Sequence, residues 1–307
     1  MAEDIQGLPG VVTALQKGGV TKTSLGLNVA DRIAAQDNEV VMIDLDHDCH
    51  LTSLLLNDET EEKVLNDDDS HVGKAMFGDV DPEDLLIETE FGIHLLPSTN
   101  IMGEVVDRMK NTTYGVNKLR NEVIAPLYEK GYDYFLIDPP GGEGQMLDAA
   151  FVAVQRTIIP ITPEAGTVNG LARLLERTVS PLRDEGNIPI EIVAITPNRM
   201  QETISRDSSE QQIARDLNES FREHLPDYAK VDLEVFETID ELGERLTEIP
   251  KPGLRERKSI NDAFKNGLPV AQYDQECDQI EHFDTLAELV IESCEAEQEQ
   301  EEVATHG

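Results

Sequence analysis

Several residue types that mark secreted or membrane proteins are scarce in this chain. Its 307 residues include no tryptophan and three cysteines, and no apolar run approaches the roughly 18 residues that span a membrane. The cysteines, Cys49, Cys277 and Cys294, lie far apart and form no CxxC pair. The sequence therefore indicates neither a disulfide framework nor a zinc site. We expect free thiols in a reducing compartment.

Targeting signals are also lacking. The N-terminal segment MAEDIQGLPG is acidic and has no charged region followed by an apolar one, which a signal peptide requires. The C-terminal segment is acidic as well, so it would be repelled by anionic lipid. We expect a cytoplasmic protein with no membrane partner.

Basic residues are few. The chain has 25 Lys and Arg against 62 Asp and Glu, which gives a formal net charge of -37. Such charge is typical of salt-adapted proteins and opposes approach to nucleic acid. We therefore expect a cytoplasm of high salt, where the Debye length falls to about 3 Å and both repulsion and phosphate attraction weaken. Composition alone neither predicts nor excludes DNA binding.

Short apolar runs rich in β-branched residues alternate with longer helical patterns. This alternation predicts an α/β fold, doubly wound, with a mainly parallel sheet and helices on both faces. We expect one domain over residues 1–294 and an acidic disordered tail over residues 295–307. The predicted strands are residues 11–15, 40–43, 93–96, 134–137, 157–161 and 190–195.

Polar or glycine-rich clusters follow four of these strands. The first strand is followed by QKGGVTKT, the second by DLD, the fourth by DPPGG and the sixth by TPNR. In an open parallel sheet, ligands bind at the carboxyl ends of the strands. The functional residues are therefore expected in these clusters.

The first cluster has the context of a phosphate-binding loop, because it follows a strand and opens a helix. Gly18 and Gly19 allow backbone N–H groups to curl around phosphate oxygens. Lys22 is placed to reach the β- and γ-phosphates, and the Thr23 hydroxyl can ligate Mg²⁺. The alternative is a glycine-rich turn with a lysine that caps it. The predicted nucleotide-binding residues here are Lys17, Gly18, Gly19, Val20, Thr21, Lys22, Thr23 and Ser24.

The pattern Lys17-Gly18-Gly19-x-x-Lys22-Thr23 resembles the deviant Walker A motif, KGGxxKT, of the ParA/MinD family. The resemblance implies a P-loop NTPase of the deviant Walker A class, with ATP and Mg²⁺ as cofactors. In that family the first lysine reaches across a nucleotide-sandwich dimer to the partner's bound phosphates. Carried onto Lys17, this role implies an ATP-dependent homodimer in which Lys17 and Lys22 are catalytic.

Two acidic segments extend the resemblance. The segment DLD with Leu51-Thr52 resembles a family segment whose second acid orients the attacking water, so Asp46 is catalytic by resemblance. A helix N-cap is the alternative for Asp46. The segment FLIDPP resembles the Walker B motif, whose acid holds Mg²⁺ through water. This implies that Asp138 is catalytic and that Thr23 and Asp138 form the metal site.

The cluster TPNR stands where family members present an asparagine to the adenine base. The resemblance assigns this role to Asn198, whose amide pairs with both a donor and an acceptor. An Asx turn before Arg199 is the alternative.

Two positions depart from the family pattern. Thr21 replaces the usual glycine before the P-loop lysine, and a β-branched residue restricts the loop backbone. We therefore expect hydrolysis to be slower than binding would suggest. His47-Asp48 replaces the usual Pro-Gln after Asp46. His47 could make the site sensitive to pH near neutrality; an ordinary exposed loop histidine is the alternative.

One basic island interrupts the acidic chain. Its five basic residues predict a phosphate-contacting patch for non-specific DNA, and internal ion pairing with the acidic surface is the alternative. The first predicted strand begins too early for a preceding helix-turn-helix, so operator recognition is not expected. The residues of the island are Lys251, Arg255, Arg257, Lys258 and Lys265.

Three functions remain open from the sequence. The first is a ParA-like ATPase in plasmid or chromosome partitioning, stimulated by a ParB-like centromere-binding protein and associated with the nucleoid if it binds DNA. The second is an orphan ParA-like ATPase that positions another cargo. The third is an iron–sulfur P-loop reductase, which the spacing of the three cysteines does not fit.

Overall fold

The computed structural model describes residues 7–15, 21–66, 70–164, 166–201, 208–242 and 252–306. Within these residues, seven strands form one sheet in the order β3-β4-β2-β5-β1-β6-β7. Every adjacent pair is parallel except β3 with β4. The strands are β1 (Gly10–Thr13), β2 (Val40–Asp44), β3 (Ile87–Glu88), β4 (Ile93–Leu96), β5 (Tyr134–Asp138), β6 (Arg156–Ile161) and β7 (Glu191–Pro197).

The structure confirms the predicted doubly wound α/β fold and all six predicted strands, with ends that differ by no more than two residues. The strands are buried on both faces, which explains their continuous apolar character. The antiparallel strand β3 is not predicted, because its two residues are too short to show a periodic pattern.

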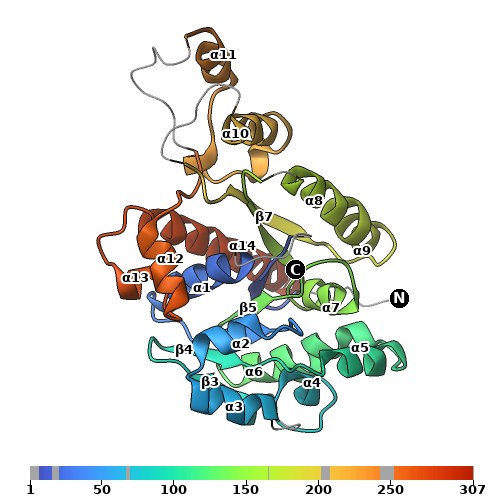
Figure 1. The fold of residues 1–307 in the computed structure, drawn as a ribbon. Helices are drawn as coiled ribbons and strands as arrows, with labels where there is room; N and C mark the ends of the chain where they lie inside the picture. The colour runs from blue at the N-terminus through green and yellow to red at the C-terminus, as the bar shows by residue number, and fades with distance from the viewer. Residues whose placement is uncertain are drawn as a thin grey trace.

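Helices cover the sheet on both sides (Figure 1). None of those in the described part of the chain combines the length and apolar character that a membrane crossing requires. The α-helices are α1 (Thr21–Ala34), α2 (His50–Leu55), α3 (Asp58–Asn66), α4 (Val72–Ala75), α5 (Met102–Lys110), α6 (Ala125–Glu129), α7 (Gln145–Val154), α8 (Thr167–Leu174), α9 (Ser180–Asp184), α10 (Ser209–Ser220), α11 (Leu233–Leu242), α12 (Lys258–Lys265), α13 (Val270–Tyr273) and α14 (Ile280–His306).

The parallel strands contribute to two hydrophobic cores, because successive side chains point to opposite faces of the sheet. Val12 and Ile43 belong to a core shared with α5, α6, α7 and α8. Their neighbours Val11 and Met42 belong to a second core, shared with α1 and α14. Helices α1 and α14 therefore pack against each other and against the same face of the sheet.

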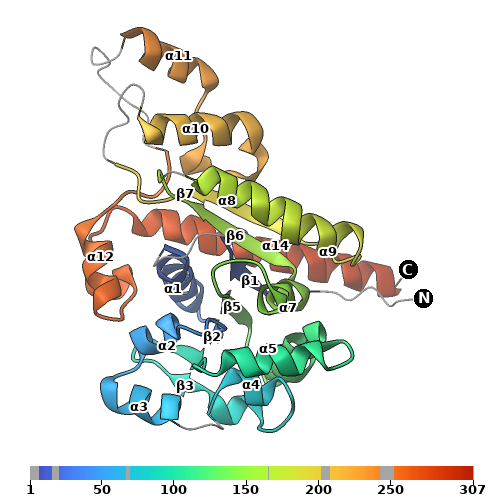
Figure 2. The same cartoon turned by 45° about the vertical axis from the view of Figure 1, so that its right-hand side comes forward.

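The helices α10 and α11 form an arm that projects beyond the β7 edge of the sheet (Figures 1 and 2). The arm has a small core of its own, made by Ala214, Val231, Phe236 and Ile239. Its Tyr228 ring stacks on His282 of α14 at 4.3 Å between centroids, and its hydroxyl lies 2.9 Å from Thr196 Oγ1 in β7. These contacts join the base of the arm to the sheet.

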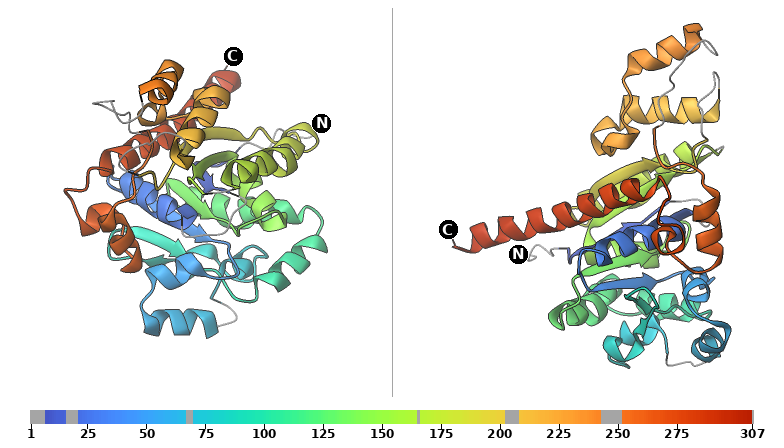
Figure 3. Two further views of the ribbon diagram at one scale, coloured as in Figure 1. Left: turned by 45° about the horizontal axis from the view of Figure 1, so that its top comes forward. Right: turned by 90° about the vertical axis from the view of Figure 1, so that its left-hand side faces the viewer.

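The C-terminal helix corrects one prediction. Composition predicts a disordered tail from Glu295, whereas α14 continues to His306 and extends past the end of the sheet (Figure 3). Glu, Gln and Ala favour helix, which offsets the charge of this segment. Arg156, which is 2% exposed, also holds the helix through hydrogen bonds to Ser293 and an ion pair with Glu297.

The segment after residue 252 runs beside the loop that follows β7. Leu254 N–H donates to the Pro197 carbonyl at 2.8 Å, and Met200 N–H donates to the Leu254 carbonyl at 2.9 Å. Gly253 makes this approach possible, because its φ is +85° and a Cβ there would lie 2.5 Å from Pro197 Cβ. The close contact brings a late part of the chain against the end of β7.

We expect Gly253→Ala to lower the free energy of unfolding by roughly 1–3 kcal/mol, since the added methyl group meets Pro197 and the left-handed φ becomes strained. The control is Gly103→Ala in α5, where nothing lies within 4 Å of an added Cβ. It should be neutral or stabilise by up to about 1 kcal/mol. Urea unfolding followed by circular dichroism measures both, and equal values would contradict the close-approach argument.

Candidate functional site

The first turn of α1 and the end of β5 bring three of the predicted residues together. Thr23 Oγ1 donates to Asp138 Oδ2 at 2.6 Å, and Lys22 Nζ donates to the Pro139 carbonyl at 2.8 Å. All three predicted side chains, of Lys22, Thr23 and Asp138, are buried. Their meeting follows from the sheet order, because β1, which leads into α1, pairs directly with β5. Lys17, Gly18, Gly19 and Val20 lie outside the described residues.

Asp138 has an incomplete set of hydrogen bonds. Its Oδ2 accepts from Thr23, whereas its Oδ1 is buried and has no partner within the described residues. Burial raises the pKa of Asp138, and the Lys22 ammonium and the Thr23 hydroxyl oppose that shift. Burial disfavours the charged form of Lys22 too and so lowers its pKa, and the Asp138 charge opposes this shift most strongly. The two groups therefore stabilise each other's ionised forms.

A second carboxylate, Asp44, lies beside Asp138, because the two residues are register partners on β2 and β5. Asp44 is fully buried and accepts from the N–H and hydroxyl of Thr52 at 2.8 and 2.7 Å. Burial and the nearby Asp138 charge raise the pKa of Asp44 to about 7. Asp44 is not among the residues predicted from the sequence, although its place at the start of the DLD segment is a signal for it.

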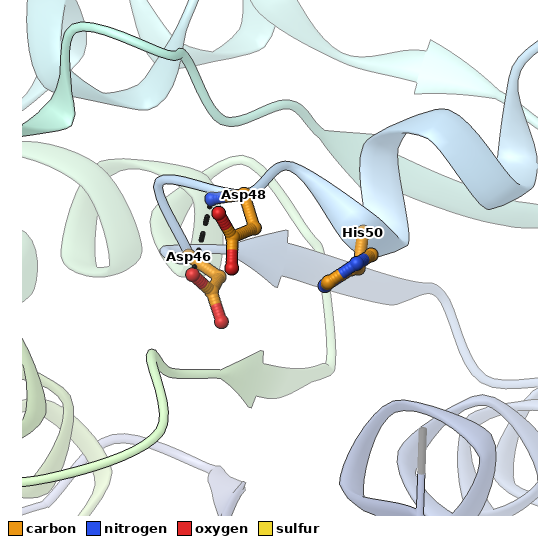
Figure 4. A group of neighbouring side chains, drawn as sticks. All are labelled: Asp46, Asp48 and His50. Carbon is orange, nitrogen blue, oxygen red and sulfur yellow. Dashed lines mark hydrogen bonds between the residues drawn. The ribbon is translucent and has the colours of Figure 1, made fainter. Parts of the chain in front are cut away.

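Asp46 lies in the loop that connects β2 to α2, with Asp48 and His50 nearby (Figure 4). One ligand atom from each of these three side chains lies within 4.8 Å of the others. Asp48 and His50 are exposed, and exposed acidic groups often gather without an ion, so we assign no metal here. The N-cap of α2 is Cys49, which removes the helix-cap alternative for Asp46.

His47 follows Asp46 on the surface. Its ring is 65% exposed, and its Nδ1 lies 3.1 Å from Asp46 Oδ1. The exposure fits the alternative of an ordinary loop histidine, although the ring touches the carboxylate that the resemblance makes catalytic.

A pocket of about 450 Å³ opens next to the first turn of α1. Thr21 and Ser24 of that turn line it together with Asn198, so the structure brings these predicted nucleotide-binding residues to one place. The opposite wall comes from the C-terminal part of the chain, which no sequence motif connects with the site. That wall includes Ile260, Asn261, Phe264 and Phe283.

Asn198 is fixed at the end of β7. Its N–H donates to the Ile161 carbonyl at 2.7 Å, and its side-chain oxygen accepts from Arg199 N–H at 2.7 Å. Arg199 has a left-handed φ of 58°. This bond reaches the next residue and not the residue two positions on, so it is not the predicted Asx turn. Asn198 lines the pocket, and its contact with a base stays a prediction.

The predicted basic island is corrected in part. Arg255 is 4% exposed and donates from Nη1 to the Gln201 carbonyl at 3.0 Å, so it presents no surface to DNA. Arg257 forms two hydrogen bonds with Asp278, at 2.8 and 2.6 Å. The predicted alternative of ion pairing with the acidic surface therefore holds for Arg257, whereas Arg255 is buried against a backbone carbonyl. Lys258 and Lys265 are exposed, with 92% and 73% of their side chains accessible, and Lys251 lies outside the described residues.

The three cysteines are free and buried. Cys49 precedes α2, Cys277 precedes α14 and Cys294 lies within α14. Burial raises the pKa of the Cys49 thiol to about 11, which keeps it protonated near neutral pH.

The chain is similar to several known proteins. Residues 10–192 match the AAA_31 family, described as an AAA domain. The chain is 25% identical over 279 residues to the chromosome partitioning protein ParA of Caulobacter vibrioides, which covers 91% of this chain and 92% of that protein.

Two solved structures share the fold. Apo McdA of Cyanothece has a TM-score of 0.67 at 20% identity and covers 93% of this chain and 98% of its own. A putative plasmid partition protein of Borrelia burgdorferi bound to AMPPNP has a TM-score of 0.65 at 19% identity, with 93% and 99% covered. At these identities the two structures support the fold alone.

The ion pair between Arg257 and Asp278 can be tested directly. Its hydrogen bonds lower the pKa of Asp278 from 3.8 to about 2, so the carboxyl stays ionised until the pH falls to that value. We expect Arg257→Ala to return this pKa toward 3.8, measured by NMR titration of the carboxyl carbon. Lys258→Ala should leave it unchanged. An unshifted pKa in Arg257→Ala would show that Arg257 is not paired in solution.

Proposed function

Because the chain belongs to the AAA_31 family and is a P-loop protein of the ParA/MinD type, we propose that it is an ATPase that acts in DNA partitioning. It binds ATP with Mg²⁺, forms a sandwich homodimer and hydrolyses ATP to ADP and phosphate. The observation that carries this proposal is the meeting of Lys22, Thr23 and Asp138 at the start of α1.

The residues at this meeting point fit a nucleotide with its metal. The Thr23 hydroxyl and the Asp138 carboxylate would hold Mg²⁺, and the unpartnered Asp138 Oδ1 is available for a water of the metal's shell. The ion, when bound, offsets the negative charge of the β- and γ-phosphates. Lys22 Nζ, now on the Pro139 carbonyl, is free to exchange that bond for a phosphate oxygen.

The nucleoside end of ATP fits the pocket beside α1. Its volume of about 450 Å³ falls within the range of roughly 300–1,000 Å³ that is usual for small-molecule sites. Ile260 and Phe264 supply apolar walls for a base, and Asn198 supplies the amide. The C-terminal segment thus takes part in nucleotide binding.

Hydrolysis then depends on Asp46 and Lys17. We assign Asp46 to orient the attacking water and Lys17 to reach the partner's phosphates, as in the family. Burial lowers the pKa of Lys22, and the charge of Asp138 opposes this shift most strongly. The Asp46 carboxylate lies near enough to Lys22 to oppose the shift as well. This closeness supports a place for Asp46 beside the phosphates.

The DNA-partitioning role rests on the family and on the chromosome partitioning relative. The partner we assign is a ParB-like centromere-binding protein that stimulates hydrolysis. Non-specific DNA is the second partner, and Lys258 and Lys265 are the residues of the basic island that are exposed to meet it.

The dimer switch is tested by light scattering in high salt. With ATP and Mg²⁺ we expect the mass of the 34.1 kDa chain to double, and with ADP we expect a monomer. Asp46→Ala should keep the dimer for longer, because ATP persists, and Lys22→Ala should stay monomeric, because phosphate contacts are lost. ATP binding without a dimer would contradict the switch.

DNA contact is tested with Lys258→Glu, since this side chain is exposed and lies outside the nucleotide pocket. We expect weaker retention on random-sequence DNA and a decrease of about one in the salt slope of log K, while the ATPase rate is unchanged. Lys110→Glu on α5 is the matched control, because Lys110 is also exposed and adjoins an aspartate. Equal retention by the two variants would exclude contact at Lys258.

A further inference from the structure

Four residues near the candidate site form a closed ring of hydrogen bonds. Asp44 Oδ2 accepts from the Thr52 hydroxyl at 2.7 Å, and Thr52 Oγ1 accepts from Ser98 N–H at 3.0 Å. Ser98 Oγ donates to the Asp46 carbonyl at 2.6 Å, and Asp46 N–H donates to Asp44 Oδ1 at 3.0 Å. The ring returns to the carboxylate from which it starts.

The ring joins three separate parts of the chain. Asp44 ends β2, Thr52 lies in α2, and Ser98 follows β4, the parallel neighbour of β2. All three side chains are buried. A single lost hydroxyl would therefore leave an unpaired group in a place that water does not easily reach.

Both backbone groups of Asp46 are held by the ring, whereas its carboxylate is not part of it. The N–H bonds to Asp44 and the carbonyl accepts from Ser98, with a further bond from Cys49 N–H at 3.0 Å. Within the described residues, the carboxylate has two local contacts: it accepts from Asp48 N–H at 3.1 Å, and it lies 3.1 Å from His47 Nδ1. The ring therefore fixes the backbone of Asp46, from which the side chain projects, and leaves the carboxylate oxygens outside the ring.

Keeping Asp44 ionised at this position has a cost. The carboxylate is fully buried next to Asp138, and a buried charge is tolerated only when donors compensate it. Three donors do so here: Asp46 N–H, Thr52 N–H and the Thr52 hydroxyl. Two of these three bonds belong to the ring. The same ring of hydrogen bonds therefore stabilises the charge of Asp44 and fixes the backbone of Asp46.

We propose that Asp44, Thr52 and Ser98 are positioning residues that hold the Asp46 backbone, so that its carboxylate faces the phosphate site for hydrolysis. The inference rests on the proposed ATPase function and deepens it. The three residues touch neither nucleotide nor water in the reaction; they act through Asp46. Their loss therefore lowers turnover more than it lowers ATP affinity.

The primary variant is Ser98→Ala, which removes the bond to the Asp46 carbonyl. We expect kcat to fall roughly tenfold or more with KM changed less than twofold, because the water-orienting group is displaced while phosphate contacts stay. Ser53→Ala is the matched control, since it removes an exposed hydroxyl from α2 and should change neither value.

Thr52 offers an internal pair of variants. Thr52→Val keeps the shape of the side chain and removes the hydroxyl that both donates to Asp44 and accepts from Ser98. Thr52→Ser keeps the hydroxyl and removes a methyl group. We expect the valine variant to lose kcat like Ser98→Ala and the serine variant to stay close to the unmodified protein. Equal losses in both would overturn the hydrogen-bond argument.

A double-mutant cycle separates positioning from a general loss of structure. If Ser98 acts through Asp46, then Ser98→Ala has no further effect on kcat in an Asp46→Ala background. A further loss by the same factor would overturn the proposal, because it would show that Ser98 acts independently of the carboxylate.

Hydrogen–deuterium exchange gives a readout that needs no activity. Ser98→Ala should speed exchange of the backbone amides at residues 46–49 by tenfold or more, while amides of β5 keep their protection. If the unmodified protein hydrolyses no ATP, the proposed function fails, and this exchange result alone decides whether the ring holds Asp46. Unchanged exchange, or faster exchange with unchanged kcat in an active protein, would overturn the proposal.

Discussion

The structure depends on two buried carboxylates, Asp44 and Asp138, at the ends of neighbouring parallel strands. Like charges so close in a low-dielectric setting repel each other, and burial raises the pKa of both groups. The surrounding chain supplies the compensation. Thr23 and Lys22 of α1 face Asp138, while Thr52 of α2 and the loop backbone face Asp44. The first turn of α1 and the start of α2 are thereby fixed relative to the same edge of the sheet.

That edge also explains why distant parts of the sequence share one pocket. The first turn of α1 lines one side of the pocket, and residues of α12 and α14 line the other. Gly253 permits the segment before α12 to run against Pro197, one residue before Asn198. The pocket wall opposite the first turn of α1 therefore depends on Gly253 as well as on the motifs near the start of the chain.

Sequence patterns predicted the elements better than they predicted the side chains between them. Buried parallel strands have continuous apolar runs, and the rule that ligands bind at strand ends predicts from the sequence that Lys22, Thr23 and Asp138 lie together. The burial of Arg255, the bonds of Ser98 and the pocket face of Phe264 depend on long-range packing, which leaves no local pattern. The continuation of α14 past Glu295 likewise depends on Arg156, far away in the sequence.

The use of basic residues bears on any role with DNA. In a chain of net charge -37, arginines bind carboxylates of the same molecule, as in Arg32–Asp284, Arg108–Asp79 and Arg257–Asp278. Such pairs make little positive field outside the protein, because each cation is offset nearby. A DNA contact built on the few exposed lysines would release few counterions, and its affinity would depend less steeply on salt than that of a protein with a large basic face. A shallow dependence of this kind would distinguish such a contact from binding by a large basic face.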